Sequence, residues 1–222
     1  MHTSLTDPPA TGTPELERQK AAITRLGDEL RALVEATART AASPATLHRM
    51  ADGVRTLTGQ LTGRRRARGE ISEVDEFPTG TRIYSPVTGA GSPLAPPMQV
   101  MPADDGLIGE CTLGIAHEGP PGYGHGGMSA MLLDELMARA CAAAGMPGLT
   151  VSLQMRYHRP VPLETPLRIL TRVTGTDARK ILVSGSITSR TDPGTNLVTA
   201  DGIFVTPDPL RVHALFPGLQ SS

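Results

Sequence analysis

One segment of the sequence, Met128 to Ala144, constrains the fold more than any other. Its residues are apolar around nearly the whole circumference of a helix, which is typical of a helix buried on all sides. The segment is followed by Gly145 and then Pro147, a common combination at the end of a helix. Because a buried helix needs apolar surroundings, the rest of the chain must supply elements that enclose it.

Strand-like segments lie on both sides of this helix in the sequence. Leu107 to His117 carries apolar or small residues at alternate positions, as a strand does. Four similar runs follow the helix, at residues 151–158, 167–174, 181–188 and 197–205. Turn-forming residues separate the last three runs, at 175–177 and 192–194, so we expect the four to pair as an antiparallel meander. The pattern predicts an α+β fold, with an antiparallel sheet wrapped around a central helix.

The amino-terminal part of the chain predicts a helical hairpin. One helix is expected from Pro14 to about Thr40, and a second from Ser43-Pro44 to near Gly63, because apolar residues recur there at helical spacing. Two helices alone bury too little surface to be stable, so they must pack on the main domain or on a partner subunit. We therefore divide the chain into a helical extension with a disordered start (1–63), an Arg- and Pro/Gly-rich connector (64–97), a main domain (98–207) and a C-terminal tail (208–222).

Composition excludes several classes of protein. The 21 basic and 22 acidic residues nearly cancel, so we expect no nucleic-acid partner. No stretch approaches the ~20 apolar residues that span a bilayer, so we expect no membrane span. The first residues lack the features of a secretory signal, which favours a cytoplasmic location. Cys111 and Cys141 match no disulfide or zinc pattern and are expected in the core; we expect no metal and no cofactor.

The segment that indicates chemistry is the start of the buried helix. His125-Gly126-Gly127 places two glycines where free backbone N–H groups point outward and a ligand can approach the main chain closely. Such a tip can bind a carbonyl oxygen that becomes an oxyanion. Asp134 follows two turns later, in a helix otherwise built for burial, where a carboxylate costs several kcal/mol unless it is compensated. We interpret Asp134 as a functional carboxylate; the alternative is a structural one that is paired with a neighbouring arginine or solvated at an edge.

The spacing of these groups predicts a homodimer. Gly127 and Asp134 are separated by roughly 10 Å along one helix axis, so one helix cannot bring both to the same reacting carbon. Two antiparallel copies of the helix across a two-fold axis would place Gly127 of one opposite Asp134 of the other. Pairing of such dimers into a homotetramer is left open.

Residues 118–127, EGPPGYGHGG, followed by Asp134, resemble the hotdog-fold acyl-CoA thioesterases of the PaaI-like type and their mitochondrial long-chain relatives. Residues 148–151, GLTV, and 156–163, RYHRPVPL, are similar to the second half of the same pattern. The resemblance covers about residues 98–207. It implies a hotdog fold, an acyl-CoA substrate, and hydrolysis of the thioester to the free acid and CoA.

The resemblance also implies roles for individual residues. The Gly127 amide would polarise the thioester carbonyl, with His125 and Gly126 shaping that pocket. Asp134 of the opposing subunit would act as general base or nucleophile, and Thr150 would help to position the water. His125 could instead be a loop residue that bonds the backbone. The asparagine that several relatives carry ahead of the glycines is absent, which leaves the oxyanion site less defined than the base.

Basic residues are candidates for binding the phosphates of CoA, because guanidinium groups suit phosphate. The candidates are Arg156, Arg159, Arg179 and Lys180. The arginine-rich run at 64–68 is interpreted as a solvated connector.

Two alternative functions remain open. A hotdog enoyl-CoA hydratase or dehydratase would pair a histidine with a carboxylate, and His117 with Glu135 could imitate that pair. A non-catalytic acyl-CoA sensor would use the amino-terminal helices as its effector arm, although these helices lack a basic recognition face.

Overall fold

The computed structural model describes residues 14–75 and 82–208; the disordered start predicted for residues 1–12 and nearly all of the predicted tail lie outside these ranges. The helices are α1 (Pro14–Arg39), α2 (Pro44–Gln60) and α3 (Gly126–Ala143), with a short 3₁₀ turn η1 (Ile115–His117). The strands are β1 (Gln99–Ala103), β2 (Gly106–Thr112), β3 (Leu149–Tyr157), β4 (Pro166–Asp177), β5 (Lys180–Ser189) and β6 (Asp192–Val205).

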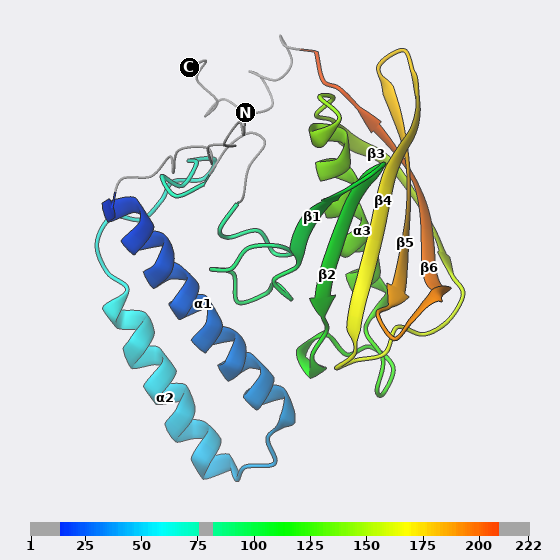
Figure 1. Cartoon of the computed structure of the whole chain (residues 1–222). Coiled ribbons are helices and arrows are strands. Elements are labelled where there is room, and N and C mark those ends of the chain that lie inside the picture. Colours follow the sequence, from blue (N-terminus) through cyan, green and yellow to red (C-terminus); the bar gives the residue numbers. More distant parts are fainter. Residues whose placement is uncertain (1–13, 76–81, 209–222) are drawn as a thin grey trace, which may run out of the picture.

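The strands form one antiparallel six-stranded sheet in the order β1-β2-β4-β5-β6-β3. The sheet curves around α3, which lies against its inner face (Figure 1). Leu132, Leu133, Leu136 and Met137 of α3 have no exposed surface. The predicted α+β architecture, a sheet wrapped around a central helix, is confirmed, and it is the hotdog fold.

Glycines in three strands let α3 approach the sheet. A β-carbon at Gly109 would lie 3.1 Å from Leu136, one at Gly185 would lie 2.8 Å from Leu133, and one at Gly202 would lie 2.9 Å from Met137. A side chain at any of these positions would therefore require the facing side chains of α3 to shift. Close packing of this kind leaves little room for a volume change on either surface.

The predicted connectivity of the sheet is wrong in one respect. β4, β5 and β6 form a meander, but β3 pairs with β6 rather than with β4, and β2 occupies the place beside β4. The connection from β3 to β4, residues 158–165, contains Pro160 and Pro162 and crosses from one side of the sheet to the other. It is too long and too proline-rich for the tight turn that a hairpin needs.

Several element boundaries also differ from the predictions. The strand predicted to run to His117 ends at Thr112, and η1 follows it. Residues 192–194 open β6, so the turn falls at residues 190–191 instead; Gly175 belongs to β4 beside an irregularity in its pairing with β5. β1 was not predicted, because Pro102 interrupts its pattern; as an edge strand it tolerates that residue.

The two amino-terminal helices are present as predicted and run antiparallel (Figure 1). In α1, Gly27 is buried, and its α-carbon lies so close to the connector that a β-carbon would meet the Ala90 carbonyl oxygen at 2.4 Å. No residue of α2 is buried. The later part of the connector is packed on the main domain without regular structure; its buried apolar residues include Ile83, Val87 and Ala95.

Within residues 14–75 and 82–208, no helix combines the length and apolar character needed to cross a bilayer. In the same ranges, no group of three or more His, Cys, Asp or Glu side chains is arranged to hold a metal ion.

Candidate functional site

The amino-terminal tip of α3 is formed by His125, Gly126 and Gly127. His125 is the N-cap residue, and its Nδ1 accepts a hydrogen bond of 3.0 Å from the Gly127 N–H. The imidazole is therefore unprotonated at Nδ1, and the amide assigned to carbonyl binding has an internal acceptor in the isolated chain. In the part of the chain that the structure describes, the Gly126 N–H has no acceptor. The tip thus has one free amide N–H, and a ligand oxygen could replace the histidine as the acceptor of the other.

Asp134 lies two turns into α3 and is partly buried. Thr150, at the start of β3, donates a hydrogen bond of 2.7 Å from its Oγ1 to Asp134 Oδ1. The fold therefore brings together two candidate residues that are 16 positions apart in sequence. The hydroxyl fixes one carboxylate oxygen, and Oδ2 has no hydrogen-bond partner among the described residues. No cation lies within ion-pair distance of Asp134 among the described residues, which sets it apart from a paired structural carboxylate.

An irregularity in β3 aims Thr150 at the helix. Thr150 pairs with Phe204 and Ser152 pairs with Ile203, so Val151 is an extra residue in the strand. If β3 paired regularly through Val151, without the bulge, Thr150 would lie on the opposite face from Leu153, which faces the inner side of the sheet opposite Gly202. A β-bulge re-aims one side chain in this manner. Val151 is left 61% exposed while Thr150 reaches Asp134.

Tyr157, at the other end of β3, contacts the helix tip. Its hydroxyl donates to the Gly126 carbonyl oxygen at 3.1 Å, and its ring lies 3.4–3.5 Å from where a Gly126 β-carbon would be. A β-carbon at position 126 would thus be in ordinary van der Waals contact with the ring, so this contact by itself does not require glycine there. Tyr157 belongs to the motif at 156–163, but the sequence alone indicates no role for it. The structure shows that the end of strand β3 passes over the helix tip.

The four basic candidates do not converge within one chain. Arg156 forms an ion pair with Asp201 at 2.9 Å, near the end of β3. Lys180 pairs in register with Val205, which in turn pairs with Leu149 at the start of β3. Arg179 lies in the adjacent β4–β5 turn, whereas Arg159 follows β3 in the crossover. Arg156 and Arg159 thus lie at one end of the sheet, and Arg179 and Lys180 at the other.

His117 and Glu135 are not paired with each other within the chain. His117 Nε2 lies 3.4 Å from the Leu94 carbonyl oxygen. Glu135 accepts from Arg139 at 3.0 Å and from the Thr88 hydroxyl at 3.3 Å, and so ties α3 to the connector. Their observed partners are structural.

The cysteines show no sign of a reactive thiol. Both are buried, and burial raises the pKa of Cys111 to about 12 and that of Cys141 to about 11. Each therefore stays protonated at neutral pH and acts as a core residue.

Comparison with known proteins places the site within a family. The sequence profile of the thioesterase superfamily matches residues 121–194, which include the helix tip, Asp134 and Thr150. Acyl-coenzyme A thioesterase THEM4 of Rattus norvegicus is 32% identical over 96 residues, covering 43% of this chain and 41% of THEM4. Acyl-coenzyme A thioesterase THEM5 of Homo sapiens is 30% identical over 88 residues, covering 40% of this chain and 35% of THEM5. The matches thus span about two fifths or less of these relatives' length.

A solved structure extends the similarity to the amino-terminal helices. The crystal structure of a thioesterase superfamily protein is 34% identical, with a TM-score of 0.70, and the match covers 90% of this chain and 94% of that one. The chain belongs to the thioesterase superfamily.

Proposed function

We propose that this protein hydrolyses acyl-CoA thioesters to the free acid and CoA. The observation that carries the proposal is the pair formed by Asp134 and Thr150, with the carboxylate partly buried, free of a cation, and on the same helix as a glycine tip. A fixed carboxylate and a set of outward N–H groups are the two parts that acyl transfer to water requires. The acyl-CoA thioesterases with which the chain shares about 30% identity support the same reaction.

In the proposed reaction, the thioester carbonyl oxygen replaces His125 Nδ1 as acceptor of the Gly127 N–H. A water molecule attacks the carbonyl carbon while Asp134 Oδ2 takes its proton, and the tetrahedral intermediate then expels CoA as its thiolate. The thiolate recovers the proton from Asp134, so the cycle leaves acid, CoA and a regenerated carboxylate. The nucleophilic alternative has Asp134 attack first and form a mixed anhydride, which water cleaves. An acyl–Asp134 adduct trapped in a rapid quench and detected by mass spectrometry would identify the nucleophilic route, and ¹⁸O from labelled water in Asp134 after a single turnover would do so where water attacks the Asp134 carbonyl carbon.

The proposed site is shared between two copies of the chain, because Gly127 and Asp134 are seven residues, or roughly 10 Å, apart along α3. Strand β3 supports such an arrangement. Within the part of the chain that the structure describes, it pairs only with β6, and Val151 and Tyr157 are 61% and 55% exposed along it. An open strand edge of this kind is suited to pairing with a second strand. Antiparallel β3 strands across a two-fold axis would bring the α3 helices side by side in opposite directions.

The same two-fold axis offers a reason for the division of the basic residues. Antiparallel pairing of β3 would place Arg156 and Arg159 of one copy at the sheet end that carries Arg179 and Lys180 of the other. We propose that these groups together bind the phosphates of CoA, which guanidinium forks and ammonium groups suit.

The test is thiol release from a panel of acyl-CoA thioesters by the wild-type protein and by Asp134→Asn. General-base loss predicts a fall in kcat on the order of 10²–10⁴-fold with little change in acyl-CoA binding. Thr150→Val should lose roughly tenfold, because one hydrogen bond to a charged group is removed. Asp105→Asn is the matched control, since that carboxylate is 75% exposed in the β1–β2 turn. Full activity of Asp134→Asn would overturn the assignment, and binding without hydrolysis by the wild type would favour the sensor.

A further inference from the structure

A groove of about 540 Å³ lies beside the tip of α3 and is walled by the amino-terminal extension. Ala32 and Val34 of α1 form one wall, and connector residues including Pro93 and Leu94 form another. Met128 and Met131 of α3 lie on the opposite side. The volume falls within the ~300–1,000 Å³ range of sites that bind small molecules.

The lining of the groove is aliphatic. Among the described residues it contains alanine, valine, leucine, methionine and four prolines, and no Phe, Tyr or Trp. Its two charged residues are engaged: Arg31 donates to the Ala90 and Ser92 carbonyl oxygens at 2.8 and 2.7 Å, and Glu35 accepts from backbone N–H groups of η1. His117 also borders the groove, but its Nδ1 is buried and has no exposed surface there. The surface therefore suits an alkyl chain rather than a polar or stacked group.

Two residues connect the groove to the candidate site. Met131 follows Gly127 by four positions and precedes Asp134 by three, so the three lie along one face of α3. Met131 is 38% exposed, and Met128, one turn earlier in the helix, is partly exposed. Methionine side chains are flexible and adapt to chains of different shape. An acyl group with its carbonyl at the tip of α3 would therefore have its tail at the mouth of the groove.

The outer wall is held in a fixed place. Glu35 accepts hydrogen bonds from the N–H groups of Ile115 and Ala116, at 3.1 and 3.2 Å, and so ties α1 to η1. Arg31 ties the same helix to the connector, and Gly27 lies against Ala90 and Gly91. A wall bound at three points limits the depth of the groove instead of yielding to its contents.

We propose that this groove holds the alkyl chain of the acyl group, and that α1 and residues 93–97 set the longest chain accepted. The inference rests on the proposed hydrolysis of acyl-CoA, and it gives the amino-terminal extension a role in substrate selection. The preferred substrates are medium- to long-chain aliphatic acyl thioesters.

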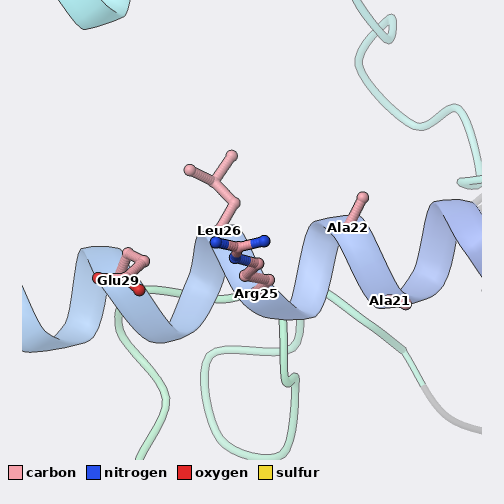
Figure 2. A pocket seen from close by; sticks show the side chains of 5 residues that line it. All are labelled: Ala21, Ala22, Arg25, Leu26 and Glu29. Atoms are coloured by element: carbon pink, nitrogen blue, oxygen red, sulfur yellow. The ribbon is translucent and has the colours of Figure 1, made fainter.

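The test introduces a large side chain into the groove from each of two walls, in two separate variants. Ala32→Phe projects from α1 and Leu94→Trp from the connector; both positions are exposed, so the fold should accept either change. The matched control is Ala22→Phe on the same helix, which borders a separate shallow hollow lined only by residues of α1 (Figure 2). Hydrolysis of acetyl-, hexanoyl-, decanoyl- and palmitoyl-CoA is measured for each variant.

Both filling variants should lower kcat/KM for decanoyl- and palmitoyl-CoA by roughly tenfold or more, since single methylenes in an apolar pocket discriminate by about 10–200-fold. Acetyl-CoA should change less than twofold, and Ala22→Phe should leave the whole profile unchanged. An unaltered chain-length profile in both filling variants overturns the proposal. If the wild type hydrolyses no thioester, the proposed function fails. The groove is then tested by NMR, from the shifts of the Met128 and Met131 methyl resonances when decanoyl-CoA is added. Absence of these shifts would overturn the groove proposal as well.

Discussion

The hotdog domain and the amino-terminal helices use the same apolar residues in opposite ways. In α3, Leu136 and Met137 are fully buried. In α2, Leu57 is 60% exposed and Met50 is 55% exposed, although they recur at helical spacing as a core face would. α1 is intermediate, because its docking depends on Gly27, Arg31 and Glu35 more than on its leucines. An apolar stripe thus identifies a face that can be covered, but only the fold tells whether this chain covers it.

The largest expected effect tests burial directly. Leu136→Ala should lower the free energy of unfolding by about 2–5 kcal/mol, because it leaves a cavity between α3 and the sheet. Leu57→Ala in α2 should change it by less than about 0.5 kcal/mol. Urea unfolding followed by circular dichroism measures both. If Leu57→Ala were as costly as Leu136→Ala, the stripe on α2 would be covered in solution and the contrast between the regions would fail.

An intermediate effect is expected from one substitution made on each amino-terminal helix. Gly27→Ala places a methyl group 2.4 Å from the Ala90 carbonyl oxygen, which should cost about 1–3 kcal/mol in the α1–connector contact. Gly53→Ala in α2 meets nothing within 4 Å and should stabilise its helix by about 0.5–1 kcal/mol. The readout is hydrogen exchange of the Gly91 amide, which is bonded to the Ile83 carbonyl oxygen.

Exchange at Gly91 should accelerate in Gly27→Ala and stay unchanged in Gly53→Ala. Equal protection in the two variants would show that the connector does not depend on α1 for its position.

The smallest effect concerns pH. Burial raises the pKa of Glu35, but hydrogen bonds from Arg39, Ile115 and Ala116 outweigh burial and hold the pKa below its ordinary value of 4.5. Since the folded pKa is lowered, the stabilisation is present above pH 4.5 and is lost as pH falls through the folded pKa. Its size should be at most about 1 kcal/mol for a group this exposed.

Protection of the Ile115 and Ala116 amides, corrected for intrinsic exchange, should therefore decline between pH 5 and pH 3 in the wild type. Glu35→Gln should show weaker protection with no such decline. A decline of the same size in Glu35→Gln would assign the pH dependence to another group.

Sequence patterns were sufficient for the buried helix, its stop at Gly145, both amino-terminal helices and most strands, because each depends on local periodicity and turn residues. The strand order was not accessible in this way, since the place of β3 beside β6 depends on a crossover rather than on a local turn. β1 was missed because its proline is tolerated only at a sheet edge.

The candidate site was predictable in its chemistry but not in its contacts. A carboxylate in an apolar helix and a double glycine at the helix start are visible in the sequence. The acceptor on the Gly127 amide, the Tyr157 contact and the walls of the groove are not, because each joins segments far apart in the chain. Strict alternation along β3 would even have turned Thr150 away from Asp134.

The bulge in β3 affects how related sequences should be compared. The contact between hydroxyl and carboxylate depends on the register of β3 as much as on residue identity, since the bulge takes Val151 out of the alternation and leaves Thr150 on the same face as Leu153. A relative could keep Thr, Asp and every residue between them and still lose the contact if β3 paired with β6 without the bulge, whereas deletion of the extra residue would restore plain alternation and leave the hydroxyl on the helix side. Conservation of the two residue types alone is therefore not sufficient to infer the contact.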